Sequence, residues 1–173
     1  MKKLICATLV LLFVIGSLLA FASCGTSKKA NIPDGYKLYD NGSISFAYPD
    51  DWSMTDGSVG ILVNPTGIGN NITITYSDES DIYKTMDIDS FNDLIAPQLV
   101  AAGMDIYTPT VQQLKNGIGT NVTKIHFTTI MYDISMEQTM FVLNSDSKTY
   151  VITITEIDPD KKLVQTVFDT LSN

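Results

Sequence analysis

The sequence predicts a single α+β domain in which helices pack against a twisted, mainly antiparallel sheet. Three observations carry this prediction. Stretches that alternate polar and apolar residues, the period of a half-buried strand, follow one another between residues 121 and 156. Two other stretches, near residues 90–103 and 158–171, place apolar residues at spacings of three and four, as amphipathic helices do. A chain of 173 residues is long enough for one domain with its own core.

The predicted strands end at residues that stop or turn a strand. The first, at residues 43–48, ends at Pro49, which has no N–H for a sheet ladder. Breaks near Asp133 and at 145–147 predict that the late strands are joined as antiparallel hairpins. The remaining strands are expected at 61–63, 71–76, 122–132, 135–143 and 149–155.

Two helices are expected. The first begins with Ser90 as its N-cap and ends at Gly103, which suits the left-handed residue after a helix. Pro97 lies inside it, so we expect a kink or two short helical pieces. The second has Asp158 as its N-cap and Pro159 at its first position.

The amino-terminal segment has the features of an export signal. Two lysines at positions 2–3 precede an uncharged apolar stretch, residues 4–22, which would be about 29 Å long as a helix. The end of this stretch resembles the cleavage site of bacterial lipoproteins, which implies cleavage after Ser23 and a diacylglycerol on the Cys24 sulfur. Phe21 departs from the family pattern, which usually has Leu there. An uncleaved transmembrane anchor and ordinary secretion stay open as alternatives.

This interpretation divides the chain into three parts: a cleaved signal peptide (1–23), a lipidated N-terminus with a flexible spacer (24–35) and one domain (36–173). The domain would lie on the extracytoplasmic face of a bacterial cell membrane, tethered by its lipid. Cys6 lies in the removed segment, so the mature chain would keep Cys24 alone and could form no internal disulfide.

Charge limits the possible partners. Of the 11 basic residues Lys2 and Lys3 are removed, which leaves 9 against 19 acidic residues and a net charge of −10. The chain has no arginine, and nucleic-acid binding requires clustered positive charge, so we expect no nucleic-acid partner. Charged residues at 17% and a hydrophobic fraction of 45% also exclude a disordered chain.

One short motif points to a family. The stretch Tyr48-Pro49-x-x-Trp52 follows an apolar strand, and with the element order over residues 36–173 it resembles the PsbP-like and DcrB-like lipoprotein families. The resemblance implies an α/β/α sandwich around an antiparallel sheet and a non-catalytic protein-binding or assembly role. It carries over no catalytic residue. We expect Trp52 to fold back onto the core, and the alternative is that Tyr48 and Trp52 line a binding cleft.

The sequence offers few candidates for catalytic or metal-binding residues. His126 is the only histidine and lies within a predicted strand, on the face shared with Lys124 and Thr128, so an ordinary strand histidine is favoured over a catalytic one. The chain lacks a G-x-S-x-G motif and enough Cys or His for zinc, and no cofactor is expected. An acidic segment is a weak candidate for calcium or manganese, although a solvated loop is favoured; its possible ligands are Asp78, Asp81, Asp87 and Asp89.

The sequence therefore favours a membrane-anchored, non-catalytic module that binds or assembles another extracytoplasmic protein. The first alternative is a lipoprotein that binds a solute or a metal ion, and the second is a hydrolase that depends on His126. The sequence predicts neither the partner nor the oligomeric state.

Overall fold

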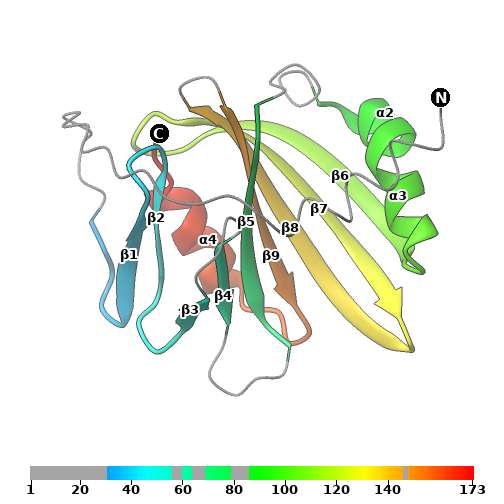
Figure 1. The fold of residues 1–173 in the computed structure, drawn as a ribbon, viewed down its shortest axis with the longest axis horizontal. Helices are drawn as coiled ribbons and strands as arrows, with labels where there is room; N and C mark the ends of the chain where they lie inside the picture. Colours follow the sequence, from blue (N-terminus) through cyan, green and yellow to red (C-terminus); the bar gives the residue numbers. More distant parts are fainter. Residues whose placement is uncertain (1–30, 56–59, 64–68, 79–85, 146–147) are drawn as a thin grey trace.

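The strands of the chain form two antiparallel sheets, seen in a computed structural model that describes residues 31–55, 60–63, 69–78, 86–145 and 148–173 (Figure 1). The larger sheet has seven strands in the order β3-β4-β5-β9-β8-β7-β6, and the smaller pairs β1 with β2. The strands are β1 (Tyr36–Asp40), β2 (Ser45–Pro49), β3 (Ser53–Thr55), β4 (Gly60–Val63), β5 (Asn71–Ser77), β6 (Asp105–Lys115), β7 (Asn121–Met131), β8 (Ile134–Ser145) and β9 (Lys148–Glu156).

Six strands are confirmed with ends within two residues of those predicted, and they include the late meander β7-β8-β9. Tyr132 and Asp133 join β7 to β8 with φ angles of +52° and +63°, which is the left-handed backbone of a two-residue hairpin turn. The predicted hairpin at Asp133 is therefore correct. The turn between β8 and β9 includes residues 146–147, which lie outside the described residues, but the antiparallel pairing of the two strands is confirmed.

The strands β1, β3 and β6 were not predicted. In β6 a bulge between Tyr107 and Thr110 shifts the register against β7, and Thr108 within it has a φ of +49°. A bulge inserts an extra residue, so the alternation of polar and apolar residues changes phase inside the strand. Pro109 also argues against a strand in the sequence, but β6 is an outer strand, where proline is tolerated.

The first helical segment begins at a different residue from the one predicted. Asp87, not Ser90, is the N-cap of α2 (Ile88–Ser90), and its carboxylate accepts a 2.8 Å hydrogen bond from the Ser90 N–H. A π-helix, η1 (Phe91–Ile95), follows directly, and α3 (Ala96–Ala101) then carries Pro97 near its start. The expected division into short pieces is thus correct, since a proline in the first turn of α3 needs no N–H partner. Gly103 after α3 has a φ of +85°, as predicted.

The last helix, α4 (Lys161–Thr170), begins two residues later than predicted. Asp160, not Asp158, is its N-cap, with its carboxylate accepting a 2.8 Å hydrogen bond from the Lys162 N–H. Asp158 instead accepts, through its backbone carbonyl, a hydrogen bond from the Asn70 side chain. The start of the helix is thus set by contacts with the chain before β5, which local sequence rules do not include.

Alternate residues of the meander contribute to two separate hydrophobic clusters. Phe141 and Leu143 pack with the α4 residues Leu163 and Val167, while Val142 belongs to the other cluster. Because neighbouring residues of a strand point to opposite faces, the two clusters lie on opposite faces of the sheet. The ring of Phe168 stacks on that of Phe141, with centroids 5.8 Å apart.

The second cluster lies under the first helical segment. Phe91 of η1 is fully buried and its ring lies 5.2 Å from that of Phe127 on β7. Ile95 and Leu99 pack against the same cluster. The chain is therefore a mixed α+β fold with a mainly antiparallel sheet, as predicted.

No helix among the described residues is long and apolar enough to cross a bilayer. The apolar stretch at 4–22 and the lipid attachment residue Cys24 lie outside those residues.

We predict that Phe141→Ala lowers the free energy of unfolding by about 3–5 kcal/mol, because it removes a fully buried ring that contacts α4. Urea unfolding measures the change. Val100→Ala is the matched control, since Val100 is 57% exposed on α3, and its effect should stay within about 0.5 kcal/mol. Equal effects of the two substitutions would contradict this placement of the core.

Candidate functional site

A row of polar side chains crosses the face of the sheet that α4 packs against. The pairing register places Thr110 of β6 opposite His126 of β7, and His126 opposite Thr139 of β8. Directly opposite residues of neighbouring strands point to the same face. We call this group the polar shelf; its members are Thr110, Lys124, His126, Thr128, Glu137 and Thr139.

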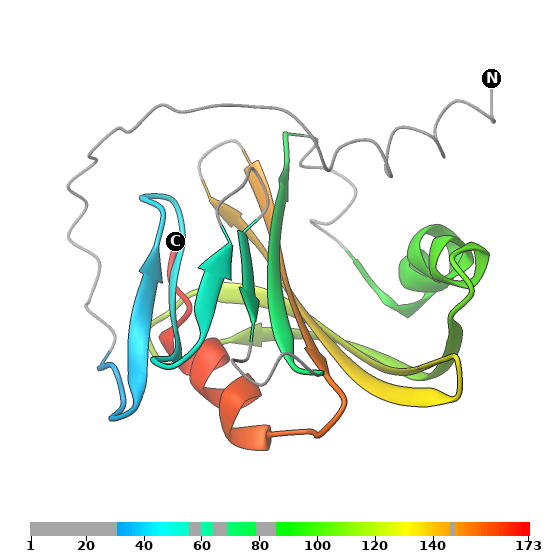
Figure 2. The ribbon, with the colours of Figure 1, turned by 60° about the horizontal axis from the view of Figure 1, so that its bottom comes forward.

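The polar shelf lies beside α4. Figure 2 shows α4 below the left part of the large sheet, while the yellow ends of β7 and β8 extend to the right beyond it. The side chains of His126 and Glu137 are 36% and 37% exposed, so solvent reaches this part of the face. Thr139, closer to the core, is buried.

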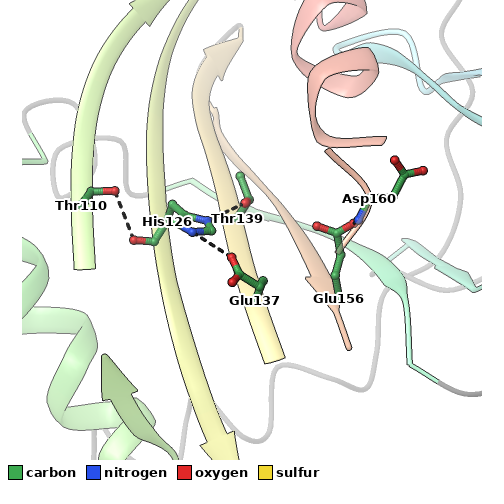
Figure 3. A network of polar contacts seen from close by, with 6 residues as sticks. All are labelled: Thr110, His126, Glu137, Thr139, Glu156 and Asp160. Carbon is green, nitrogen blue, oxygen red and sulfur yellow. Dashed lines mark hydrogen bonds and ion pairs between the residues drawn. The ribbon is translucent and has the colours of Figure 1, made fainter. Parts of the chain in front are cut away.

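His126 is held by a contact at each ring nitrogen (Figure 3). Its Nε2 lies 3.0 Å from Glu137 Oε2, and its Nδ1 lies 3.1 Å from Thr139 Oγ1. An ionised Glu137 can only accept a hydrogen bond, so Nε2 carries the proton in the neutral ring. Nδ1 then accepts from the Thr139 hydroxyl. The ring is therefore fixed in both orientation and tautomer.

The same arrangement limits what His126 can do. A general base must lie within hydrogen-bond reach of the proton that it abstracts. In neutral His126 the Nδ1 lone pair faces the hydroxyl of Thr139, a residue that is only 2% exposed, and Nε2 carries its proton toward Glu137. Thr110 adds a hydrogen bond of 3.3 Å from its hydroxyl to the backbone carbonyl of His126. These contacts match the expected strand histidine.

A buried carboxyl lies next to the shelf. Glu156 on β9 is directly opposite Glu137 and is 3% exposed. Its Oε1 accepts a 2.8 Å hydrogen bond from the backbone N–H of Asp160, the N-cap of α4 (Figure 3).

The pKa of the Glu156 carboxyl is raised. Burial is the main cause, because it disfavours the charged form. The hydrogen bond from the Asp160 N–H acts in the opposite direction, and the negative charges of the nearby carboxylates raise the pKa further; these belong to Asp160, Glu137 and Asp158. The row thus places a partly exposed imidazole on the same face as a buried carboxyl whose pKa is raised.

The acidic segment does not come together as a metal site in the described part of the chain. Asp87 is the N-cap of α2, and the hydrogen bonds from Ser90 lower the pKa of its carboxyl. Asp78 lies 3.9 Å from the Lys148 ammonium, and Asp89 is exposed. Asp81 lies outside the described residues. Those residues contain no group of three or more His, Cys, Asp or Glu side chains that could hold a metal ion.

Tyr48 and Trp52 both belong to the cluster under α4, with 8% and 5% of their surface exposed. The Lys37 ammonium donates to the Trp52 carbonyl at 2.8 Å and lies 5.0 Å from the centre of the Tyr48 ring. Trp52 therefore folds back onto the core, as expected. A binding cleft at these residues stays a prediction.

Sequence reasoning found His126 but missed Glu137, Thr139 and Glu156. The three residues lie on two strands that were predicted nearly at their true ends, so the missing information was the register between them. The predicted strand ends at Tyr132 and Ser135 would place Phe141 opposite His126, whereas the observed turn at Tyr132 and Asp133 places Thr139 there.

Comparison with known proteins identifies no family. No family model and no curated protein matches the chain. A crystal structure of a protein from Bacteroides thetaiotaomicron is 14% identical, with a TM-score of 0.48, over 85% of this chain. This chain spans about half, 48%, of that protein. A Pseudomonas aeruginosa protein of unknown function is 15% identical, with a TM-score of 0.46, over 80% of this chain and 96% of its own.

We predict that neutral His126 carries its proton on Nε2, because Glu137 can only accept and Thr139 can donate to Nδ1. Nitrogen-15 chemical shifts of the neutral ring distinguish the two tautomers, and the chain has a single histidine, so the signal needs no assignment. Thr139→Val removes the donor to Nδ1 and should shift only that nitrogen strongly. A ring protonated at Nδ1 in the unsubstituted chain would contradict the described contacts.

Proposed function

We propose that this chain is a bacterial lipoprotein, attached through Cys24 to the outer face of the cell membrane, whose α+β domain binds another extracytoplasmic protein without catalysing a reaction. The signal-like residues 1–23 and the Cys24-Gly25 junction support the anchor. The polar shelf beside α4 is the observation that supports the binding role.

The shelf is suited to binding because its side chains are already ordered. Both ring nitrogens of His126 have partners, and each partner comes from β8, the strand directly beside it. Side chains that are fixed before binding lose less conformational entropy when a partner covers them. Placement on paired strands also fixes their positions better than a loop would.

A protein is the favoured class of partner. Small-molecule sites are usually concave and enclose most of the ligand. The shelf instead extends over β6, β7 and β8, and the side chains of His126 and Glu137 are about one-third exposed. A surface that extends over three strands suits a partner that covers several strands at once.

We also propose the finer architecture implied by the PsbP-like resemblance, an α/β/α sandwich. Two contacts support it: Phe91 of η1 meets Phe127, and Phe168 of α4 meets Phe141. Phe127 and Phe141 belong to clusters on opposite faces of the sheet.

The mature chain should begin at Cys24 and carry a lipid on its sulfur, and Cys24→Ala should remove this lipid because it removes the sulfur. Cys6→Ala is the matched control, since Cys6 lies within the segment that is cleaved, and its product should still carry the lipid. Mass spectrometry of the N-terminus of the protein in the membrane fraction measures both. An unsubstituted chain that begins at a residue other than 24, or that carries no lipid, would contradict the lipid anchor.

A photo-crosslinking amino acid at Thr110 or Thr128 should capture the same discrete protein on intact cells, because both positions lie on the shelf. The control position is Gln165, which is exposed on α4. Capture of the same protein at Gln165, or of nothing at either shelf position, would contradict the shelf as the binding surface. Heat released on titration of the purified chain with calcium or manganese would favour the metal-binding alternative instead.

A further inference from the structure

The start of α4 is connected to the shelf through a single buried carboxyl. Glu156 is the last residue of β9, and its Oε1 accepts the N–H of Asp160, whose own carboxylate caps α4. The helix that begins there places Leu163, Val167 and Leu171 in the core. The contact of Glu156 with Asp160 therefore fixes where a core helix leaves the sheet.

Among the described residues, the charged groups that act on the pKa of Glu156 are all carboxylates. Glu137 is directly opposite on β8, where paired side chains have Cβ atoms about 4.5–5.5 Å apart. Asp158 precedes α4 and Asp160 caps it. Just before β5 lies the uncharged Asn70, whose side-chain oxygen accepts from the N–H groups of Ile157 and Asp158.

The nearby side chains that can carry a positive charge, His126 and Lys162, contact groups other than Glu156. His126 contacts Glu137, not Glu156. The ammonium of Lys162 lies over the ring of Tyr36, 5.5 Å from its centre. Among the residues that the structure describes, no lysine forms an ion pair with Glu156. Within the described part of the chain, an ionised Glu156 is consequently buried beside like charges, with the Asp160 N–H as its hydrogen-bond donor.

We propose that Glu156 is a proton-operated latch for α4. A protonated Glu156 is not repelled by Glu137 and still accepts the Asp160 N–H through its carbonyl oxygen, so the first turn of α4 is held. Ionisation of Glu156 adds a buried charge opposite Glu137 and loosens that turn. The latch is independent of the partner proposed above and follows from the fold alone.

The direction of the pH dependence follows from the raised pKa of Glu156, whose ordinary value is 4.5. A group whose pKa is higher in the folded chain stabilises the fold fully below its ordinary pKa, and loses that effect as the pH rises through the folded value. The first turn of α4 should thus be best protected below pH 4.5 and less protected toward neutral pH.

Hydrogen exchange of the mature lipidated chain in detergent micelles tests the latch. After correction for the intrinsic exchange rate, the opening equilibrium of residues 161–164 should increase as the pH rises from 5 to 8, by about tenfold for each unit by which the pKa is raised. Glu156→Gln is neutral at every pH and should abolish this dependence, leaving the turn protected throughout. Asp169→Asn, at the other end of α4, should retain it.

Glu137→Gln is a second variant for the same hydrogen-exchange measurement, and it tests the latch even if Glu156→Gln does not fold. It removes the charge opposite Glu156, so the pKa of Glu156 should be raised less and the loosening of the turn between pH 5 and 8 should become smaller. A pH dependence of the α4 turn that is unchanged in both variants would overturn the latch. Loss of the dependence in Glu156→Gln, or its reduction in Glu137→Gln, supports it.

Discussion

The register of the β7-β8-β9 meander is the constraint on which the rest of the structure depends. Side chains alternate between the two faces of a strand, so a shift of one residue would move every one of them to the opposite face. In the observed register Phe141 faces α4 while Val142 faces the cluster under η1. The same register brings His126, Thr139 and Glu137 together beside α4.

The core and the polar row lie on the same face of the sheet, at different positions along the same strands. On β8 the residues facing α4 change from apolar, Leu143 and Phe141, to polar, Thr139 and Glu137. On β9 they change from Ile154 to Glu156 at the end of the strand. The apolar part holds α4, and in the polar part the side chains of His126 and Glu137 are partly exposed to solvent. Packing residues and partly exposed polar residues therefore share one face without competing for the same positions.

The sequence predicted the elements better than their contacts. The six confirmed strands have clear alternation or short apolar runs that end at turn residues, and this local signal needs no tertiary information. β6 was missed because the bulge before Thr110 changes the phase of its alternation. The caps were misplaced because a carboxylate near each predicted cap, Asp87 before Ser90 and Asp160 after Asp158, accepts the capping hydrogen bond instead. The polar row could not be predicted, because Glu137 and Glu156 are distant in the chain and meet only through the register.

The most direct test of this account is the register itself. His126 and Thr139 are directly opposite, and the two-residue turn at Tyr132 and Asp133 makes them a pair without mutual backbone hydrogen bonds, the arrangement with the closest approach of Cα atoms, about 4.5 Å. A nuclear Overhauser effect between the Hα protons of His126 and Thr139 is therefore expected. Contacts of the His126 Hα with the Hα of Gln138 or Met140 in its place would mean a register shifted by one residue, and would contradict the account.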